Sequence, residues 1–332
     1  MNILIIKLGA IGDVIRTTSI LHGLKSKYEN CTIDWITKKE SFDILKNNNL
    51  IDKIYLIDEE LKNKEYDLII NLDDEDIACE LAAEIKHKEI IGAYLKDGKK
   101  IYTENSSLWF DIGLISKFGK QRADELKAQN KKTYQEIIYK ILDLQYKKQE
   151  PLLILNNDEI KFGKNFAEKN NIKNENLAIG INTGAGGRWE DKKLSIEETA
   201  ELIDKLNNNI KNVKLLLFGG PEEKERNNKI KSSVKTQIID AGCDNSLMEF
   251  ASLVNLCNIL ITSDSLAMHI GIVLKKKIIA FFCPTSPNEI ELYSRGIKII
   301  PKKGCVCCYK SKCDIPPEWD IDEIVDSVKK LI

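Results

Sequence analysis

The amino-acid sequence predicts an α/β protein built from two doubly wound, Rossmann-like domains in series. Short apolar runs alternate with helix-like runs from one end of the chain to the other, a pattern typical of parallel sheets covered by helices. The length of 332 residues fits two domains of about 150 residues better than one core. The alternation also restarts after a polar connector at 145–158. We therefore expect an N-terminal domain over 1–155, a C-terminal domain over 156–316 and a final helix over 317–332.

The first series contains five apolar runs of strand length. A helix is predicted over Asp13–Tyr28, because Ile20, Leu21 and Leu24 recur at helical spacing. Residues 95–130 are polar and irregular, which is typical of an excursion that carries specificity, and a helical segment follows at 133–144. The expected strands are Asn2–Lys7, Thr32–Ile36, Lys53–Leu56, Asp67–Asn71 and Glu89–Gly92.

The second series also alternates apolar strand-like runs with helix-like runs, and it ends on a helix. The helix-like run 321–332 has no strand after it. The expected strands are 176–181, Val213–Phe218, Gln237–Asp240, Asn258–Thr262 and Lys277–Phe282.

Composition excludes several functional classes. The formal net charge of −1 gives no support to a nucleic-acid partner. The longest apolar runs are far shorter than the roughly 20 residues that span a bilayer. The chain enters a strand at once, without the basic and apolar regions of a signal peptide, so we expect a cytoplasmic protein.

The opening stretch "IIKLGAIGDVIRTTSILHGLK" begins like a dinucleotide-binding fold, with a strand, a glycine turn and a helix. The turn carries only Gly9 and Gly12, so the full G-x-G-x-x-G is absent. Asp13 also brings a negative charge to the place where a phosphate would bind. From the residues alone, Asp13 is either a helix N-cap or a group with a chemical role.

Four strand ends of the second series carry groups suited to a nucleotide diphosphate, and ligands of open α/β sheets bind at such ends. "NTGAGGRWEDKK" offers three glycines for close backbone approach, the hydroxyl of Thr183, and the cations Arg188, Lys192 and Lys193. "GGPEE" offers Glu222 or Glu223 to ribose hydroxyls, "SDSLAMHIG" opens a helix whose N–H groups suit a pyrophosphate, and "CPTSP" follows the fourth strand. Each stretch also has a purely structural interpretation, as a turn, an N-cap, a core histidine or solvated lysines.

The stretches "IIKLGAIGDVIRTTSILHGLK", "NTGAGGRWEDKKLS", "LFGGPEE" and "TSDSLAMHIGIVLKKKIIAFFCPTSP" resemble, in this order, glycosyltransferase family 9, the ADP-heptose:lipopolysaccharide heptosyltransferases. The resemblance covers nearly the whole chain and is weakest across 95–170. It implies a GT-B fold, two Rossmann-like domains facing a central cleft, with the donor in the C-terminal domain and the acceptor in the N-terminal one. It also implies an inverting reaction that needs no metal, and a final helix that crosses back to the N-terminal domain.

The resemblance also implies roles for single residues. Asp13 would be the general base that takes the proton of the acceptor hydroxyl. Thr183, Lys192 and the backbone around Ser265 would stabilise the departing diphosphate, while Glu222 would hold the ribose and Asp264 the sugar or ribose. The full set of implied donor-binding residues is Thr183, Gly184, Lys192, Gly219, Glu222, Asp264, Ser265, Leu266, Ala267 and His269.

Two departures from the family pattern concern the donor site. The family often has "DSGPMH" where this chain has "DSLAMH", so Leu266 stands where a glycine would allow close backbone approach. The usual "KxWP" is "KKLS" here.

The last loop contains a cluster of four cysteines: Cys305, Cys307, Cys308 and Cys313. Four thiolates could enclose a structural zinc or iron ion, and a branch of the family that glycosylates autotransporter proteins holds iron through four cysteines. Reduced thiols or a disulfide are the alternatives. The other five cysteines are scattered through apolar contexts, where cysteine usually behaves as a small core residue.

The sequence therefore favours an inverting transferase that moves heptose from ADP-heptose onto a lipopolysaccharide or surface-glycan acceptor. A lipid-linked acceptor would bring the protein into peripheral contact with the inner face of the inner membrane. One alternative is a protein acceptor, as in the autotransporter branch, which iron and a large oligomer would favour. Another is an NAD-dependent or regulatory protein with two Rossmann units, which the incomplete glycine motif disfavours.

Overall fold

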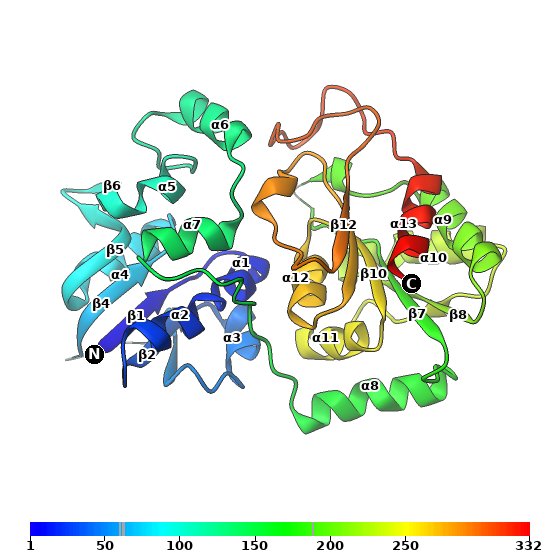
Figure 1. The fold of residues 1–332 in the computed structure, drawn as a ribbon, viewed down its shortest axis with the longest axis horizontal. Helices are drawn as coiled ribbons and strands as arrows, with labels where there is room; N and C mark the ends of the chain where they lie inside the picture. The colour runs from blue at the N-terminus through cyan, green and yellow to red at the C-terminus, as the bar shows by residue number, and fades with distance from the viewer. Residues whose placement is uncertain (60, 62–63, 188) are drawn as a thin grey trace. The chain divides into compact units, whose positions relative to one another are not determined.

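The computed structural model describes residues 1–59, 61, 64–187 and 189–332, and the chain divides into two compact units (Figure 1). The first unit comprises Met1–Ile154 with Asn288–Glu291, and the second comprises Leu155–Pro287 with Leu292–Ile332. Each unit has its own sheet and its own buried core. The two-domain α/β architecture predicted from the sequence is confirmed.

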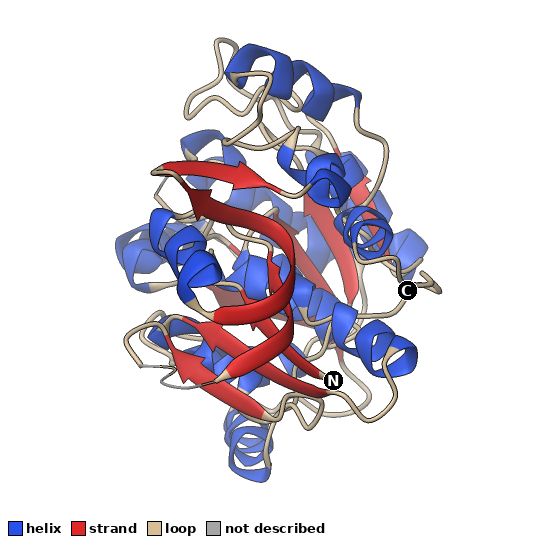
Figure 2. Cartoon of the chain, turned by 90° about the vertical axis from the view of Figure 1, so that its left-hand side faces the viewer, coloured by secondary structure: helices blue, strands red, loops and turns tan. Residues whose placement is uncertain are grey.

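The sheet of the first unit has the strand order β3-β2-β1-β4-β5-β6, in which all pairs are parallel except β5 with β6 (Figure 2). This order reverses direction between β1 and β4, as in doubly wound folds that bind ligands at this point. The five predicted strands are confirmed, although β5 is longer than expected. The bounds are β1 (Asn2–Ile6), β2 (Thr32–Thr37), β3 (Lys53–Leu56), β4 (Glu65–Asn71), β5 (Lys86–Lys96) and β6 (Lys99–Tyr102).

The helix predicted over Asp13–Tyr28 is in fact two helices, with a break at Thr18 and Ser19. The Thr18 hydroxyl accepts the Leu152 amide at 2.7 Å and also bonds the Ile15 carbonyl, while the Ser19 hydroxyl donates to the Arg16 carbonyl. Such side-chain bonds to nearby backbone compete with helix continuation. The helices of this unit are α1 (Ile11–Thr17), α2 (Ile20–Lys27), α3 (Lys39–Leu45), α4 (Asp76–Glu84), α5 (Ser107–Phe110), α6 (Lys120–Gln129) and α7 (Tyr134–Ile141), with the 3-10 turn η1 (Glu104–Ser106).

The stretch 95–130 is more ordered than the sequence analysis expected. A hairpin joins β5 to β6 through Asp97 and Gly98, both with positive φ (50° and 73°). This is the geometry of a type I′ turn, for which Asp-Gly is a strong sequence signal. The irregular interpretation was therefore wrong for β6, α5 and α6.

The sheet of the second unit is parallel throughout, in the order β12-β11-β10-β7-β8-β9. Numbered within the unit, this is the same order as in the first, with the reversal between β7 and β10. All five predicted strands are present, and β12 was missed. The bounds are β7 (Leu177–Asn182), β8 (Val213–Phe218), β9 (Ile239–Asp240), β10 (Ile259–Ser263), β11 (Lys277–Phe281) and β12 (Gly296–Ile299).

Three helices of the second unit, α8, α9 and α11, begin with reciprocal capping boxes. At α9 the Ser195 side chain accepts the Glu198 amide at 3.0 Å, and Glu198 accepts the Ser195 amide at 2.7 Å. These caps fix where the helices start. The helices are α8 (Asn157–Lys169), α9 (Ile196–Asn209), α10 (Lys224–Ser233), α11 (Leu247–Asn255), α12 (Leu266–Val273) and α13 (Ile321–Leu331), with the 3-10 turns η2 (Glu190–Lys192) and η3 (Pro221–Glu223). The 3-10 turn η4 (Pro287–Glu289) lies where the chain passes from the second unit into Asn288–Glu291 of the first.

The C-terminal helix α13 packs within the second unit, and the expectation that it crosses back to the N-terminal domain stays a prediction. It lies against α9 and β11, and Lys205 of α9 pairs with Asp322 at 2.7 Å. Its apolar stripe of Ile321, Ile324 and Val328 belongs to the same buried cluster as the strands of that unit. An amphipathic helix buries this stripe where apolar surface is nearest, which here is its own sheet. Among the described residues, no helix has the length and apolar character needed to cross a membrane.

Candidate active site

The loop after β7 is held together by buried hydrogen bonds. The Asn182 amide donates to the Gly184 carbonyl at 2.7 Å and to the Thr262 hydroxyl at 3.2 Å. The Thr183 hydroxyl lies within hydrogen-bond distance of the Asn227 side-chain oxygen (2.6 Å) and of the Phe218 carbonyl (3.1 Å). Thr183 is therefore engaged inside the unit, and its expected contact with a phosphate has no support in this geometry.

The two glutamates of the loop after β8 have different surroundings. Glu223 is buried, accepts the Gly220 amide at 3.0 Å and pairs with Lys193 at 2.8 Å. Glu222 is exposed and lines the pocket described below. Glu222 thus remains available to a ribose, whereas Glu223 and Lys193 stabilise the loop.

The loop after β10 leads directly into the N-terminus of α12. Ser265 is the residue before the helix, and its hydroxyl lies 3.1 Å from that of Thr262. The Met268 and His269 amides bond back to the Ser265 carbonyl, at 3.1 and 3.4 Å. The first N–H groups of a helix have no partner within the helix, so Leu266 and Ala267 offer donors to an anion.

These three loops border one pocket of about 610 Å³ in the second unit. It lies at the carboxyl ends of β7 and β8 and at the start of α12, beside the point where the strand order reverses. Its volume is in the range of sites for nucleotide-sized ligands. The lining residues are Asn182, Gly184, Ala185, Gly186, Gly219, Gly220, Pro221, Glu222, Glu223, Cys243, Asn245, Leu247, Phe250, Ser265, Leu266 and Ala267.

Six of the implied donor-binding residues line this pocket, and four do not. Gly184, Gly219, Glu222, Ser265, Leu266 and Ala267 line it, whereas Thr183, Lys192, Asp264 and His269 are absent from its lining. The apolar wall formed by Leu247 and Phe250 of α11 was missed by the sequence analysis. The spacing of Ser246 and Glu249, which form the cap of α11, is the sequence signal that could have placed this wall.

Lys192 and Asp264 form a buried ion pair. The Lys192 ammonium lies 3.1 Å from a carboxylate oxygen of Asp264 and donates to the Asp264 carbonyl at 2.9 Å. Burial alone would raise the pKa of Asp264, but the positive charges of Lys192 and His269 lower it below its ordinary value. The pair joins η2 to the loop after β10. The expected cation Arg188 lies outside the described residues.

In the first unit, Asp13 lies in the first turn of α1, and Ala10 is the N-cap residue. The interpretation of Asp13 as an N-cap is therefore wrong. Its carboxylate is about one-third exposed (35%) and pairs with Arg16 at 2.8 Å. Arg16 in turn lies over the Tyr134 ring, 4.0 Å from the ring centroid. Asp13 is thus oriented by a neighbouring cation and still reaches solvent.

Four cysteines of the second unit lie together, but they are not the four that the sequence analysis grouped. The Cys313 sulfur lies 2.7 Å from that of Cys305, 3.5 Å from that of Cys283 and 3.9 Å from that of Cys308. Cys305 and Cys308 form a disulfide. Cys283, expected to be an ordinary core cysteine, follows β11 and joins this cluster, whereas Cys307 keeps a free, half-buried thiol. We call Cys283, Cys305, Cys308 and Cys313 the cysteine cluster.

Known proteins with similar sequences are heptosyltransferases. The model of the glycosyltransferase family 9 (heptosyltransferase) matches residues 54–317. Lipooligosaccharide heptosyltransferase 2 of Campylobacter jejuni is 26% identical over 189 residues, which cover 52% of this chain and 56% of that protein. The chain thus matches little more than half the length of this relative.

Solved structures of similar fold cover nearly the whole chain. The glycosyl transferase family 9 protein from Veillonella parvula has a TM-score of 0.78 at 18% identity, covering 99% of this chain and 96% of that one. The ADP-heptose lps heptosyltransferase II of E. coli has a TM-score of 0.68 at 16% identity, covering 100% and 98%. With the family match over 54–317 and two parallel-sheet domains of the GT-B type, the chain belongs to glycosyltransferase family 9.

Proposed function

We propose that the protein is an inverting glycosyltransferase that moves heptose from ADP-heptose onto a saccharide acceptor in lipopolysaccharide or surface-glycan assembly. The observation that carries this proposal is the 610 Å³ pocket at the strand-order reversal of the second unit. Membership of family 9 supports the reaction class, and the heptosyltransferases among its relatives support the sugar.

Different residues that line the pocket would bind different parts of the donor. The amides of Leu266 and Ala267 would receive the departing diphosphate, with the positive end of the α12 dipole behind them. Glu222 would accept hydrogen bonds from the ribose, and the ring of Phe250 would pack against the base. The Lys192–Asp264 pair would hold this frame in place rather than bind the phosphate itself.

Inversion needs one in-line displacement at the anomeric carbon. The bond from that carbon to the diphosphate oxygen breaks as the acceptor oxygen attacks from the opposite side. The diphosphate leaves with the bonding electrons, and the hydroxyl proton passes to the Asp13 carboxylate. Arg16 would keep that carboxylate oriented.

Nucleotide binding is tested by thermal denaturation with ADP and with UDP. At 100 times the dissociation constant, ADP should stabilise the protein by about 2.7 kcal/mol, which raises the melting temperature of a unit this size by about 5–11 °C. Glu222→Gln should reduce this shift, whereas Glu225→Gln, an exposed glutamate on α10, should not. A larger shift with UDP than with ADP would contradict the assignment of adenine.

Transfer itself is tested with ADP-heptose and purified acceptors. Asp13→Asn should lower kcat by about 10²–10⁴-fold while leaving the thermal shift with ADP unchanged, because the base acts on the acceptor and not on the donor. An Asp13→Asn enzyme within a few-fold of the wild type would refute the base assignment. If the enzyme transfers sugar to a protein but to no glycan, the proposed saccharide acceptor is wrong and the acceptor is a protein. Flotation of the protein with lipid vesicles tests the expected peripheral membrane contact.

We further propose that the cysteine cluster binds a structural zinc or iron ion when its four thiols are reduced. A tetrahedral site with bonds of about 2.3 Å places its sulfurs about 3.8 Å apart. The distances of 3.5 and 3.9 Å from Cys313 to Cys283 and Cys308 match that spacing. The ion would fix the loop before α13 against the end of β11, with no part in the transfer chemistry.

Metal analysis of protein purified under reducing conditions without chelator tests this site. We expect one zinc or iron per chain, and its loss in Cys283→Ala but not in Cys307→Ala. Equal metal content in both variants would contradict the revised ligand set, and metal-free wild-type protein would refute the site.

A further inference from the structure

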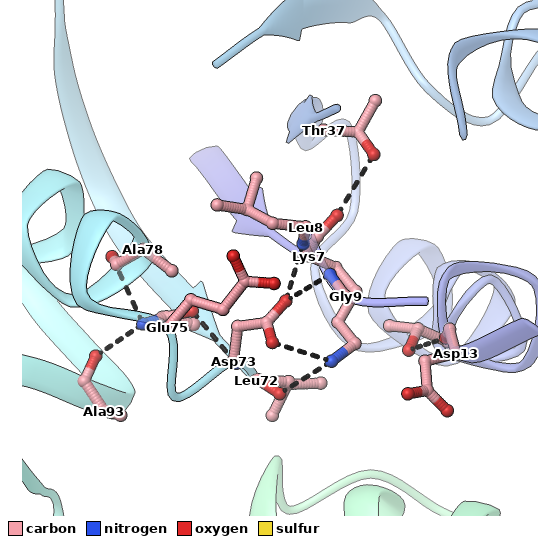
Figure 3. Close-up of polar contacts among 12 residues, drawn as sticks. Lys7, Leu8, Gly9, Asp13, Thr37, Leu72, Asp73, Glu75, Ala78 and Ala93 are labelled. Carbon is pink, nitrogen blue, oxygen red and sulfur yellow. Dashed lines mark hydrogen bonds and ion pairs between the residues drawn. The ribbon is translucent and has the colours of Figure 1, made fainter. Parts of the chain in front are cut away.

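The first unit has the same strand order as the second. At its reversal point, however, a side chain of the unit itself binds the backbone amides that could receive a ligand. The loops after β1 and β4 meet there, as the loops after β7 and β10 do in the second unit. One carboxylate oxygen of Asp73, just beyond β4, accepts the Leu8 amide at 2.6 Å and the Gly9 amide at 2.7 Å (Figure 3). In a dinucleotide-binding fold, amides of this loop receive a phosphate. Here a side-chain carboxylate occupies them.

Asp73 is itself held rigidly in place. The Asn71 side-chain oxygen accepts the Asp73 amide at 3.0 Å, and the Asn71 amide group donates to the carbonyls of Ala78 and Ala93 at 3.3 and 2.7 Å. The side chain of Asp73 is only 7% exposed. The carboxylate therefore has one position, set by the end of β4.

Lys7 supplies the counter-charge of this carboxylate. Its ammonium lies 3.3 Å from the second carboxylate oxygen of Asp73 and donates to the Leu72 carbonyl at 3.1 Å. Burial lowers the pKa of Lys7, but the negative charges of Asp73 and Asp13 outweigh it and raise the pKa above its ordinary value. Lys7 is thus a buried cation that feels both carboxylates.

The contact leaves little room for a side chain at residue 9, because a Cβ there would make its neighbours shift by a few tenths of an ångström. A Cβ atom there would lie 3.3 Å from both the Asp73 carboxylate and the Lys7 ammonium. The chain passes from Gly9 through Ala10, the N-cap of α1, to Asp13, whose amide bonds the Ala10 carbonyl at 2.7 Å. The backbone fixed by Asp73 therefore leads within four residues to Asp13.

We propose that Asp73 is a positioning residue for the transfer reaction: its carboxylate takes the place of a phosphate on the Leu8 and Gly9 amides and thereby fixes the loop that presents Asp13. The inference rests on the proposed role of Asp13 as the base. It accounts for the incomplete glycine motif, because a loop that binds an internal carboxylate has no phosphate to accommodate. It also assigns nucleotide binding to the second unit alone.

The test compares Asp73→Asn with Asp76→Asn, a matched control three residues on, whose side chain is exposed on α4. We expect Asp73→Asn to lower kcat about 100-fold, the size of effect that a 1 Å misplacement produces. The KM for the donor and the thermal shift with ADP should stay unchanged, because the donor pocket lies in the other unit. A general loss of structure would change all three.

Hydrogen exchange gives a readout that does not depend on activity. The Leu8 and Gly9 amides should exchange about tenfold faster in Asp73→Asn, because a hydrogen bond to a charged acceptor is stronger than one to a neutral acceptor. Should Asp73→Asn fail to fold, the double variant Lys7→Met/Asp73→Leu removes both buried charges and serves instead. It should show the same loss of kcat and faster exchange at both amides.

The outcomes separate this inference from the proposed function. If the wild type transfers sugar and Asp73→Asn keeps kcat within twofold of Asp76→Asn, the positioning role is wrong. Unchanged exchange at Leu8 and Gly9 would also overturn it. If the wild type transfers no sugar at all, the proposed function fails, while the exchange data still decide whether Asp73 holds the loop.

Discussion

Lys192 offers a direct test of whether a buried cation stabilises the frame of the pocket or binds the donor. The family resemblance implied contact with the diphosphate, but in the structure its ammonium lies 3.1 Å from the Asp264 carboxylate. The two side chains are 8% and 17% exposed, so bulk water screens the pair only weakly. Lys192→Met keeps most of the side-chain volume and leaves the Asp264 charge without its closest partner.

The expected loss can be estimated from this distance. Two unit charges 3.1 Å apart attract by about 5 kcal/mol at an effective dielectric constant of about 20. Removing one partner of a buried pair typically costs about 3–5 kcal/mol, because the remaining charge stays buried. With about 2–4 °C per kcal/mol, the second unit should melt about 6–20 °C lower in Lys192→Met.

Differential scanning calorimetry provides the measurement, with Lys211→Met, an exposed lysine of the same unit, as the control. The double variant Lys192→Met/Asp264→Asn should recover most of the loss, because no unpaired charge remains. If Lys192→Met melts within 2 °C of Lys211→Met but no longer shows a thermal shift with ADP, the lysine binds the donor and the structural argument fails.

Three further predictions concern single residues. Because the pKa of Asp264 is lowered from 3.8, its stabilising effect is present above that pH and is lost as the pH falls through the lower folded-state value; Asp264→Asn should therefore flatten the dependence of melting temperature on pH below about pH 4. Gly92→Ala should destabilise the first unit by about 3 kcal/mol or more, measured by urea denaturation, because φ is +118° and a Cβ would lie 1.8 Å from the Asn71 carbonyl oxygen; a loss below 1 kcal/mol would contradict this. Thr183→Val should cost about 1–2 kcal/mol in the same assay by removing the hydroxyl beside the Asn227 oxygen, with the ADP shift retained; loss of that shift would restore a donor-binding role.

The sequence was a good guide to the framework, because apolar strands of a parallel sheet leave a strong signal. Val213–Phe218 and Lys53–Leu56 have the predicted bounds, and most other strands differ by one or two residues. Two edge strands were missed, although β3, another edge strand of four residues, was predicted. β12 (Gly296–Ile299) is only four residues long, and β6 depended on recognising the Asp-Gly turn at 97–98.

The site was harder to predict, because a residue type does not reveal which partner its side chain finds. Lys192, Thr183 and Glu223 all have the chemistry of donor-binding groups, yet each bonds to another residue of the same unit. Asp73 is the opposite case, a residue whose sequence context gives no sign of the role proposed for it. Nothing in "NLDDE" distinguishes it from Asp74, and only the fold brings it to the Leu8 and Gly9 amides.

The packing of α13 within the second unit has a practical consequence for dissecting the protein. Because α13 packs on the sheet of its own unit, a chain from Leu155 to the C-terminus keeps every strand and helix around the 610 Å³ pocket. Such a truncation would omit Asp13 altogether. It would offer a minimal receptor for comparing nucleotides by calorimetry, free of turnover.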